Sequence, residues 1–278
     1  MKHILIPTDF SKNAWNALEY AANLFTNEPC RFYVLHVDTL NNSGINGNSF
    51  MVLTSPQKST TKEKLNDLTD KISSQFSNKI HQYITLQEYG NLVDIVRKTV
   101  RDKKIELIVM GSKGAKGLMA SVIGSNAGNI ITKIACNVLA VPENTKIELP
   151  NSIAFPTDYN LFYNHSILNS ITEILQITNA RLDVVHMTQS SPKFSNAQLN
   201  NKAYLSDYLK ELFIDSHCFR NIQGKEIKQA IAEYIQDNNI KMLVMVAKNL
   251  NLFQKLFFNN QIEKLSHHTS VPLLVMHE

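Results

Sequence analysis

Short runs of apolar residues without alternation recur along the chain, for example at residues 107–110 and 243–246. An unbroken apolar run of this length is typical of a strand buried on both faces, and such strands belong to parallel sheets. Between the runs, apolar residues return at helical spacing, as in residues 14–25, which follow the candidate helix cap Ser11. This alternation predicts an α/β fold with a doubly wound parallel sheet, helices on both faces and right-handed crossovers.

The same order of segments occurs twice, which indicates an internal duplication. A strand that ends in Pro-Thr-Asp appears near the start of each copy, and a strand that carries a histidine follows it. A glycine, a helical stretch and a buried strand come next, and each copy ends in a short apolar strand. The matched pairs are 4–9 with 153–158, 32–37 with 182–187, 90–95 with 224–229, 105–110 with 241–246, and 138–141 with 273–276.

The two copies differ in length between the second and third pairs of segments. The first copy is the longer one, and its polar run at residues 41–49 is the natural place for the excursion, which extends to about residue 59. Prolines and polar residues interrupt the apolar pattern near residues 145–151, which marks the junction. We therefore predict two domains, residues 1–147 and residues 148–278.

A glycine-rich segment follows the strand of residues 105–110. It reads GSKGAKGL from Gly111, and Gly124-Ser125-Asn126 then opens a predicted helix at residues 127–134. A strand, a glycine turn and a new helix N-terminus suit a phosphate, because missing Cβ atoms let backbone amides approach and the unpaired helix amides attract negative charge. The spacing G-x2-G-x9-G-S fits neither the Walker loop nor GxGxxG.

With these motifs, the chain resembles the universal stress protein family over nearly its whole length, twice. The resemblance implies Rossmann-like domains of the adenine nucleotide alpha hydrolase type. It also implies that the last strand of each copy, 138–141 and 273–276, pairs with the other, so that one chain forms an intramolecular pseudo-dimer.

The resemblance further implies an ATP site in the first domain, and Mg²⁺ is a candidate companion of the nucleotide. Asp9 is expected to contact the ribose and the backbone of Val37 to hold the adenine edge. The glycine loop and the start of the next helix are expected to surround the phosphates. The predicted ATP-binding residues are Pro7, Thr8, Asp9, Val37, Met110, Gly111, Gly114, Gly124, Ser125 and Asn126.

The second copy departs from this pattern. Our alignment of the repeats places Ala247, Leu250, Asn260 and Gln261 opposite Gly111, Gly114, Gly124 and Ser125. Every glycine is therefore replaced, and we expect this copy to have lost ATP while its cleft stays open to a nucleoside or another ligand. Its Asp158 is retained, and we interpret it as a helix cap.

Several residues have a plainer interpretation beside the functional one. Asp9 is also placed to be a helix N-cap. His36 and His186 lie beside apolar strand residues, so we interpret both as satisfied core groups and assign no catalytic residue. Lys113 and Lys116 are either auxiliary phosphate contacts or solvated loop residues.

Composition further limits the classes of protein to which this chain can belong. The 278 residues carry a net charge of +4 without a long basic block, which gives no indication of nucleic-acid binding. We expect no membrane span and a cytoplasmic protein, because no apolar stretch approaches a bilayer's length and the 3 cysteines lack CxxC spacing. We predict no metal site in the protein itself.

Three functions remain open at this point. The leading one is an ATP-binding stress-response or regulatory protein, in which occupancy of the first domain changes what an unidentified protein partner recognises. The second is a slow Mg²⁺-dependent ATP hydrolase, for which no water-positioning base is evident. The third is a nucleotide-free scaffold for protein interactions, which leaves the glycines of the first loop unexplained.

Overall fold

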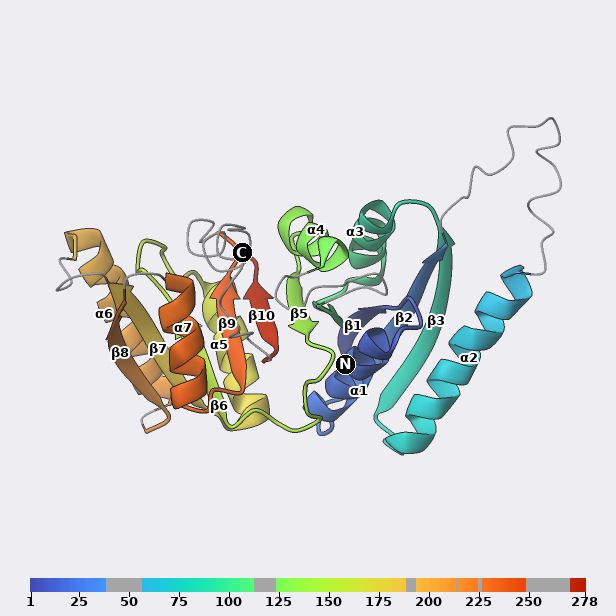
Figure 1. Cartoon of the computed structure of the whole chain (residues 1–278), viewed down its shortest axis with the longest axis horizontal. Coiled ribbons are helices and arrows are strands. Elements are labelled where there is room, and N and C mark those ends of the chain that lie inside the picture. Colours follow the sequence, from blue (N-terminus) through green and yellow to red (C-terminus); the bar gives the residue numbers. More distant parts are fainter. Residues whose placement is uncertain (39–56, 113–123, 189–193, 214, 225–226, 249–270) are drawn as a thin grey trace.

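The structure is a computed structural model of the whole chain (Figure 1). The residues that it describes are 1–38, 57–112, 124–188, 194–213, 215–224, 227–248 and 271–278. The polar excursion predicted at 41–49 lies outside them, whereas residues 57–59, which we counted with that excursion, belong to a helix.

Strands and helices alternate through the first half of the chain, as the apolar runs predict. Its described strands lie in the order β3-β2-β1-β4-β5, and neighbours pair in parallel. The predicted cap Ser11 accepts a hydrogen bond from the amide of Ala14 and starts α1. The elements are β1 (Lys2–Pro7), α1 (Lys12–Leu24), β2 (Cys30–Asp38), α2 (Gln57–Gln75), β3 (His81–Tyr89), α3 (Leu92–Lys103), β4 (Leu107–Gly111), α4 (Ser125–Lys133) and β5 (Asn137–Val141).

The second half repeats this plan. Its described strands lie in the order β10-β9-β6-β7-β8, again with parallel neighbours. The elements are β6 (Ser152–Pro156), α5 (His165–Thr178), β7 (Arg181–Thr188), α6 (Asn196–Leu212), β8 (His217–Gln223), α7 (Ile227–Asp237), β9 (Met242–Val246) and β10 (Leu273–Met276).

The two halves join where β5 and β10 pair in antiparallel orientation, so the described strands form one continuous 10-stranded sheet. Leu139 pairs with Leu274, and Val138 pairs with Val275. Leu139 and Leu274 are equivalent positions of the repeat, so the pseudo-twofold axis passes between them. The pairing of the two last strands that the resemblance implied is confirmed.

The helices cover both faces of this sheet (Figure 1). One layer of buried side chains joins the sheet to α1, α2, α5 and α6, and it continues across the seam through Leu139 and Leu274. The other layer joins the opposite face to α3, α4 and α7. The predicted fold class is confirmed. Residues 142–151 connect β5 to β6, and the division at residue 147 stays a prediction.

Within the described part of the chain, every helix is too short or too polar to cross a bilayer.

Candidate functional site

The strand order reverses between β1 and β4. From β1 the chain builds outward to β2 and β3, whereas β4 lies on the other side of β1 and leads to β5. In open parallel sheets, ligands bind at the carboxyl ends of the strands beside such a reversal. Pro7 ends β1, Thr8 and Asp9 follow it, and Gly111 ends β4, so these predicted site residues meet at that edge.

The turn after β1 is held by its own side chains. The Thr8 hydroxyl accepts a hydrogen bond from the amide of Phe10 at 3.1 Å, and the Asp9 carboxylate accepts one from the amide of Ser11 at 3.0 Å. Phe10 has a φ of 62°, which reverses the chain. Ser11, not Asp9, is the N-cap of α1. Asp9 is exposed at the sheet edge.

His36 fixes the end of β1 from the neighbouring strand. Its Nδ1 lies 2.8 Å from the carbonyl oxygen of Thr8, and its ring packs on Phe10 at a tilt of 34° with centroids 4.6 Å apart. Its Nε2 lies 3.2 Å from the carboxylate of Asp38, which also accepts from the side-chain amide Nε2 of Gln87 at 2.8 Å. The histidine is thus satisfied, as predicted, and it also bonds to the residue that follows the last pair of the β1–β2 ladder.

The backbone of Val37 is left open by that arrangement. The β1–β2 ladder ends with Pro7 opposite Leu35, and the amide of Thr8 donates to the carbonyl of Leu35 at 2.8 Å. Because backbone groups alternate sides along a strand, the N–H and C=O of Val37 point to the same side as those of Leu35. The next acceptor in the ladder, the Thr8 carbonyl, bonds instead to the side chain of His36. No described residue bonds to the Val37 backbone on this side.

Gly111 makes room for a side chain of the protein itself. A Cβ on Gly111 would lie 2.4 Å from Nδ2 of Asn13, which is buried in the first turn of α1. The glycine therefore lets α1 approach the end of β4. The sequence alone assigned Gly111 to phosphate approach and missed this contact, because it depends on how α1 packs on the sheet.

The N-terminus of α4 lacks a side-chain cap. Gly124 occupies the N-cap position with extended backbone, and its amide donates to the carbonyl of Ser112 at 2.6 Å, which ties the helix start to the end of β4. Ser125 and Asn126 are exposed in the first turn, which carries no acidic residue. Unpaired amides at such an end attract anions.

The structure thus gathers the described members of the predicted site at one edge, on adjacent strands and the start of α4. Met110 and Pro7 are buried there, Val37 is half-buried, and Asp9, Ser125 and Asn126 are exposed. Gly114, together with the auxiliary candidates Lys113 and Lys116, lies outside the described residues.

The second half repeats the turn after its first strand. The Thr157 hydroxyl accepts from the amide of Tyr159 at 3.1 Å, and the Asp158 carboxylate accepts from the amide of Asn160 at 3.1 Å. Tyr159 has a φ of 57°. His186 places Nδ1 2.9 Å from the carbonyl of Thr157. Turn, histidine and strand end therefore match those of the first half.

Two predictions about the second half are wrong. Asp158 does not cap the following helix: α5 begins about a turn later, with Asn164 as its N-cap. The predicted counterpart of Gly111 is off by one residue. β1 pairs Ile4 with Leu107, and β6 pairs Ile153 with Met242, so Gly111 corresponds to Val246 and not to Ala247. Leu250, Asn260 and Gln261 lie outside the described residues.

The corrected register changes what the replacement means. Val246 is buried in the layer that packs against α1 and α5, on the face where Asn13 packs on Gly111 in the first half. The valine side chain therefore fills core space that Asn13 fills in the other copy. Val246 therefore changes how the core is packed and does not block the space beyond the strand ends.

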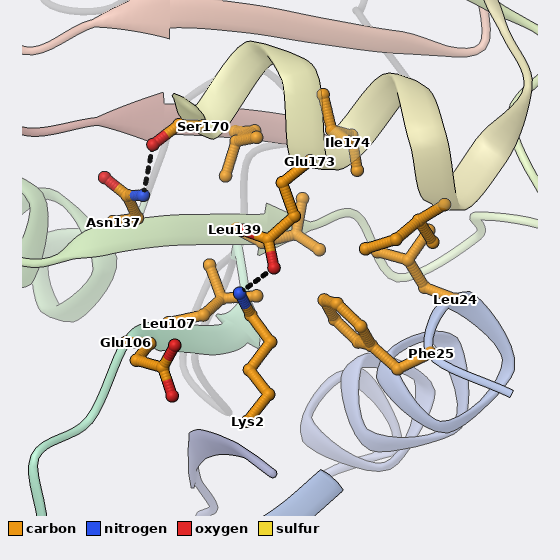
Figure 2. Close-up of a pocket in the computed structure, with 12 residues that line it drawn as sticks. Lys2, Leu24, Phe25, Glu106, Leu107, Asn137, Leu139, Ser170, Glu173 and Ile174 are labelled. Carbon is orange, nitrogen blue, oxygen red and sulfur yellow. Dashed lines mark hydrogen bonds and ion pairs between the residues drawn. The ribbon is translucent and has the colours of Figure 1, made fainter. Parts of the chain in front are cut away.

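A separate pocket lies between the halves at the amino end of β1, away from the candidate site (Figure 2). An ion pair between Lys2 and Glu173 crosses it, and Asn137 donates to the hydroxyl of Ser170 at 2.9 Å. The ammonium of Lys2 also lies 5.7 Å from the centre of the Phe25 ring. These polar groups are paired with one another, so the pocket belongs to the contact between the halves.

The cysteines do not contribute a nucleophile. Burial raises the pKa of the Cys30 and Cys136 thiols to about 12, and burial beside Asp183 raises the pKa of Cys218. A thiol with a raised pKa is a poor nucleophile at neutral pH. Among the described residues, no three His, Cys, Asp or Glu side chains gather as metal ligands.

Comparison with known protein families gives one match, in two segments. The model of the Universal stress protein family matches residues 1–142 and 165–277, which correspond to the two halves of the sheet.

Two curated relatives each match about half the length of this chain. Universal stress protein MJ0531 of Methanocaldococcus jannaschii is 31% identical over 149 residues, which are 52% of this chain and 84% of the relative. Universal stress protein MJ0577 of the same organism is 29% identical over 152 residues, which are 50% of this chain and 94% of the relative.

A solved structure matches the whole arrangement. The universal stress protein from Archaeoglobus fulgidus superimposes with a TM-score of 0.70 and covers 99% of this chain and 96% of that chain. Their sequence identity is 16%, so this likeness speaks for the fold.

Proposed function

The chain belongs to the universal stress protein family, and from that membership and the geometry of the β1–β4 edge we propose that its first half binds ATP. One observation carries the proposal above all: the open backbone of Val37 and the uncapped N-terminus of α4 lie at the same edge of the sheet. The first suits a base, and the second suits phosphates.

The base is recognised by backbone groups in this proposal. The N–H and C=O of one residue offer a donor and an acceptor side by side, and the edge of adenine offers an acceptor and a donor in return. Val37 presents such a pair where β2 extends beyond the end of β1. Met110 and Pro7 supply apolar surface nearby, and Asp9 accepts from a ribose hydroxyl.

The phosphates lie against α4. Its first amides, the backbone of Gly111, Gly114 and Gly124, the Ser125 hydroxyl and Asn126 supply donors, and the helix dipole favours the negative charge. Mg²⁺ would be held by phosphate oxygens and water, since the described residues bring no carboxylate cluster to this end.

Binding rather than turnover is the role proposed. Hydrolysis needs a group that orients a water in line with the γ-phosphate. Of the described acids at this edge, Asp9 is assigned to the nucleoside, and Asp38 is paired with His36 and Gln87. We infer a regulatory protein whose nucleotide occupancy is recognised by a protein partner. The free cysteines are consistent with a reducing, cytoplasmic compartment.

The test is calorimetric titration with Mg·ATP. The variant Gly124→Asp places a carboxylate where the phosphates are expected, and its extended backbone accepts any L-residue. Because the new charge caps α4 and repels the nucleotide, we expect affinity to fall about tenfold or more. Asn164→Asp is the matched control, because it adds the same charge at the cap of α5 without disturbing the cap.

Wild-type protein that takes up no ATP contradicts the proposed function. Equal affinities in the wild type and Gly124→Asp contradict the placement of the phosphates.

A further inference from the structure

β3 and β8 are the end strands of the described sheet, at opposite ends of the molecule (Figure 1). On the inner side of β3, Cys30 of β2 donates its amide to the carbonyl of Ile80 at 3.2 Å. Because backbone groups alternate sides along a strand, the even-numbered residues of β3 face β2 and the odd-numbered ones face outward. The outward N–H and C=O groups include those of Tyr83, Thr85 and Gln87, and no described residue bonds to them.

The outer edge of β3 lacks the features that usually prevent a strand edge from pairing. Such edges are blocked by short length, lysine, proline or a bulge. β3 has 9 residues, HQYITLQEY, with no lysine, arginine or proline, and its pairing with β2 runs without a bulge. Apolar side chains are exposed along it, since Ile80 is 39% and Ile84 36% accessible. This edge is therefore suited to pairing with another strand.

The sequence of β3 is complementary to itself in antiparallel orientation. In a pairing centred on Thr85, that residue lies opposite Thr85 of a second copy. Ile84 lies opposite Leu86, and Gln82 lies opposite Glu88. Threonine pairs and apolar pairs across strands are stabilising, and glutamine beside glutamate offers a hydrogen bond instead of repulsion. The outward backbone groups then meet as hydrogen-bonded pairs.

The other end of the sheet is protected by charge. β8 has 7 residues, and its middle residue, Arg220, is exposed. The corresponding pairing of β8 with a second copy would place Arg220 opposite Arg220, and like charges directly opposite each other are destabilising. The two ends of the sheet therefore differ in their capacity to pair with themselves.

The seam between the halves shows that an edge of this kind accommodates a twofold partner. There β5, which follows the crossover helix α4, pairs in antiparallel orientation with β10, and helices remain on both faces of the sheet (Figure 1). β3 follows the crossover helix α2 in the same way. Pairing of β3 with itself closes after two copies, whereas pairing of β3 with β8 would continue without end.

From these observations we propose that β3 is a dimerisation surface whose partner is β3 of a second copy of this chain. The two strands run antiparallel with Thr85 at the twofold axis, so that the sheets of both copies become continuous. The surface lies outside the candidate ATP site, and the proposal does not depend on nucleotide binding. Because a strand edge is a small contact, the dimer is weak and forms as protein concentration rises.

The experiment is sedimentation equilibrium of the full chain over a range of protein concentrations, which should show monomers and dimers. Thr85→Pro removes an outward N–H and leaves the ladder with β2 intact, because an edge strand accepts proline where its N–H faces solvent. We expect the dissociation constant of the dimer to rise about tenfold or more. Asn221→Pro is the matched control, because Asn221 faces outward on β8, and it should leave the dimer unchanged.

A second variant keeps every backbone group. Ile84→Lys adds a charge at the exposed edge and should also weaken the dimer, and urea unfolding of dilute protein checks that both variants are folded. In the wild type, hydrogen exchange at the amides of Thr85 and Gln87 should slow as the protein is concentrated. Wild-type protein that stays monomeric overturns the proposal. A dimer that either β3 variant leaves intact also overturns it, as does association that continues beyond two copies.

Discussion

His36 and His186 each bond to the backbone at the end of a neighbouring strand. Each places Nδ1 within 2.9 Å of the carbonyl that follows its neighbouring strand, at 2.8 Å for His36 and 2.9 Å for His186. The ring thereby competes for the acceptor that the next backbone amide would use. The interpretation of these histidines as satisfied core groups is correct. In addition, the carbonyls to which they bond, those of Thr8 and Thr157, lie at the edge of the sheet.

This role makes a prediction for His36→Phe. Phenylalanine retains the ring contact with Phe10 but cannot donate to the Thr8 carbonyl, so the amide of Val37 no longer competes with the histidine for that acceptor. We expect ATP affinity to fall about tenfold, the worth of one well-placed hydrogen-bond pair, while the free energy of unfolding changes little. Calorimetry and urea unfolding measure the two effects.

Two variants serve as controls for that change. His36→Asn keeps a donor and should recover most of the affinity, and His186→Phe, in the other half, should leave ATP binding unchanged. Full ATP affinity in His36→Phe would show that the open edge is not needed.

His277 makes the stability dependent on pH. Burial lowers the pKa of its imidazole below the ordinary 6.5, against a smaller opposing effect of the Ile131 backbone. Its Nε2 is buried without a hydrogen-bond partner among the described residues. Between the folded pKa and about 6.5 the unfolded chain binds more protons, so stability rises with pH there and is lost as pH falls through 6.5.

The expected outcome is a lower free energy of unfolding at pH 5.5 than at pH 7.5, and a smaller difference in His277→Asn. Guanidinium unfolding at both values measures it. Equal differences in the wild type and the variant would contradict the assignment to His277.

At the scale of elements, α1 and β4 approach closely because of one glycine. A methyl group on Gly111 meets the Asn13 side chain at 2.4 Å, so Gly111→Ala should destabilise the protein by about 1–3 kcal/mol, the usual cost of overpacking. Because the clash is with a side chain, Asn13→Ala in the same molecule should return part of that loss. A double-mutant cycle of unfolding free energies tests this coupling. Additive effects of the two substitutions would rule out the contact.

The elements themselves are largely predictable from sequence, for a physical reason. Apolar runs without alternation identify the buried strands, and Ser11 marks the start of α1 because its hydroxyl caps the helix. The register of one apolar run against its counterpart in the other half is not predictable, because every residue in β4 or β9 suits a strand buried on both faces. The alignment therefore slipped by one residue, and Ala247 was matched where Val246 belongs.

Parts of the candidate site depend on contacts that no local pattern records. The Asn13–Gly111 contact and the bond from His36 to Thr8 join residues of different elements. The cap of α5 was misplaced at Asp158 because the second half carries extra residues, including the buried Tyr163, before its helix starts at Asn164. The Pro-Thr-Asp turn, by contrast, repeats so closely that its sequence alone locates both strand ends.

At the scale of the whole molecule, the seam makes two halves into one sheet. Leu139 and Leu274 face each other on the pseudo-twofold axis, and one buried layer runs through both. Around this axis the contacts are not symmetric. Asn137 donates to Ser170 and accepts from the amide of His277 at 2.8 Å, while Pro272 occupies the position equivalent to Asn137. Such asymmetry favours pairing of one half with the other within the same chain.

The seam predicts a single cooperative unfolding transition that a substitution in β10 can divide. The carbonyls of Pro272 and Met276 accept from β9, so by alternation the amide of Val275 faces β5. Val275→Pro removes a hydrogen bond between the halves and should cost about 3 kcal/mol or more. Differential scanning calorimetry should then show two transitions, and Mg·ATP should raise the midpoint of one of them, whereas in the wild type it raises the single midpoint.

Glu173→Gln, which weakens the ion pair to Lys2 without touching the ladder, should keep one transition. A single ATP-sensitive transition in Val275→Pro would mean that the packed layer of side chains, rather than the strand pairing, couples the two halves.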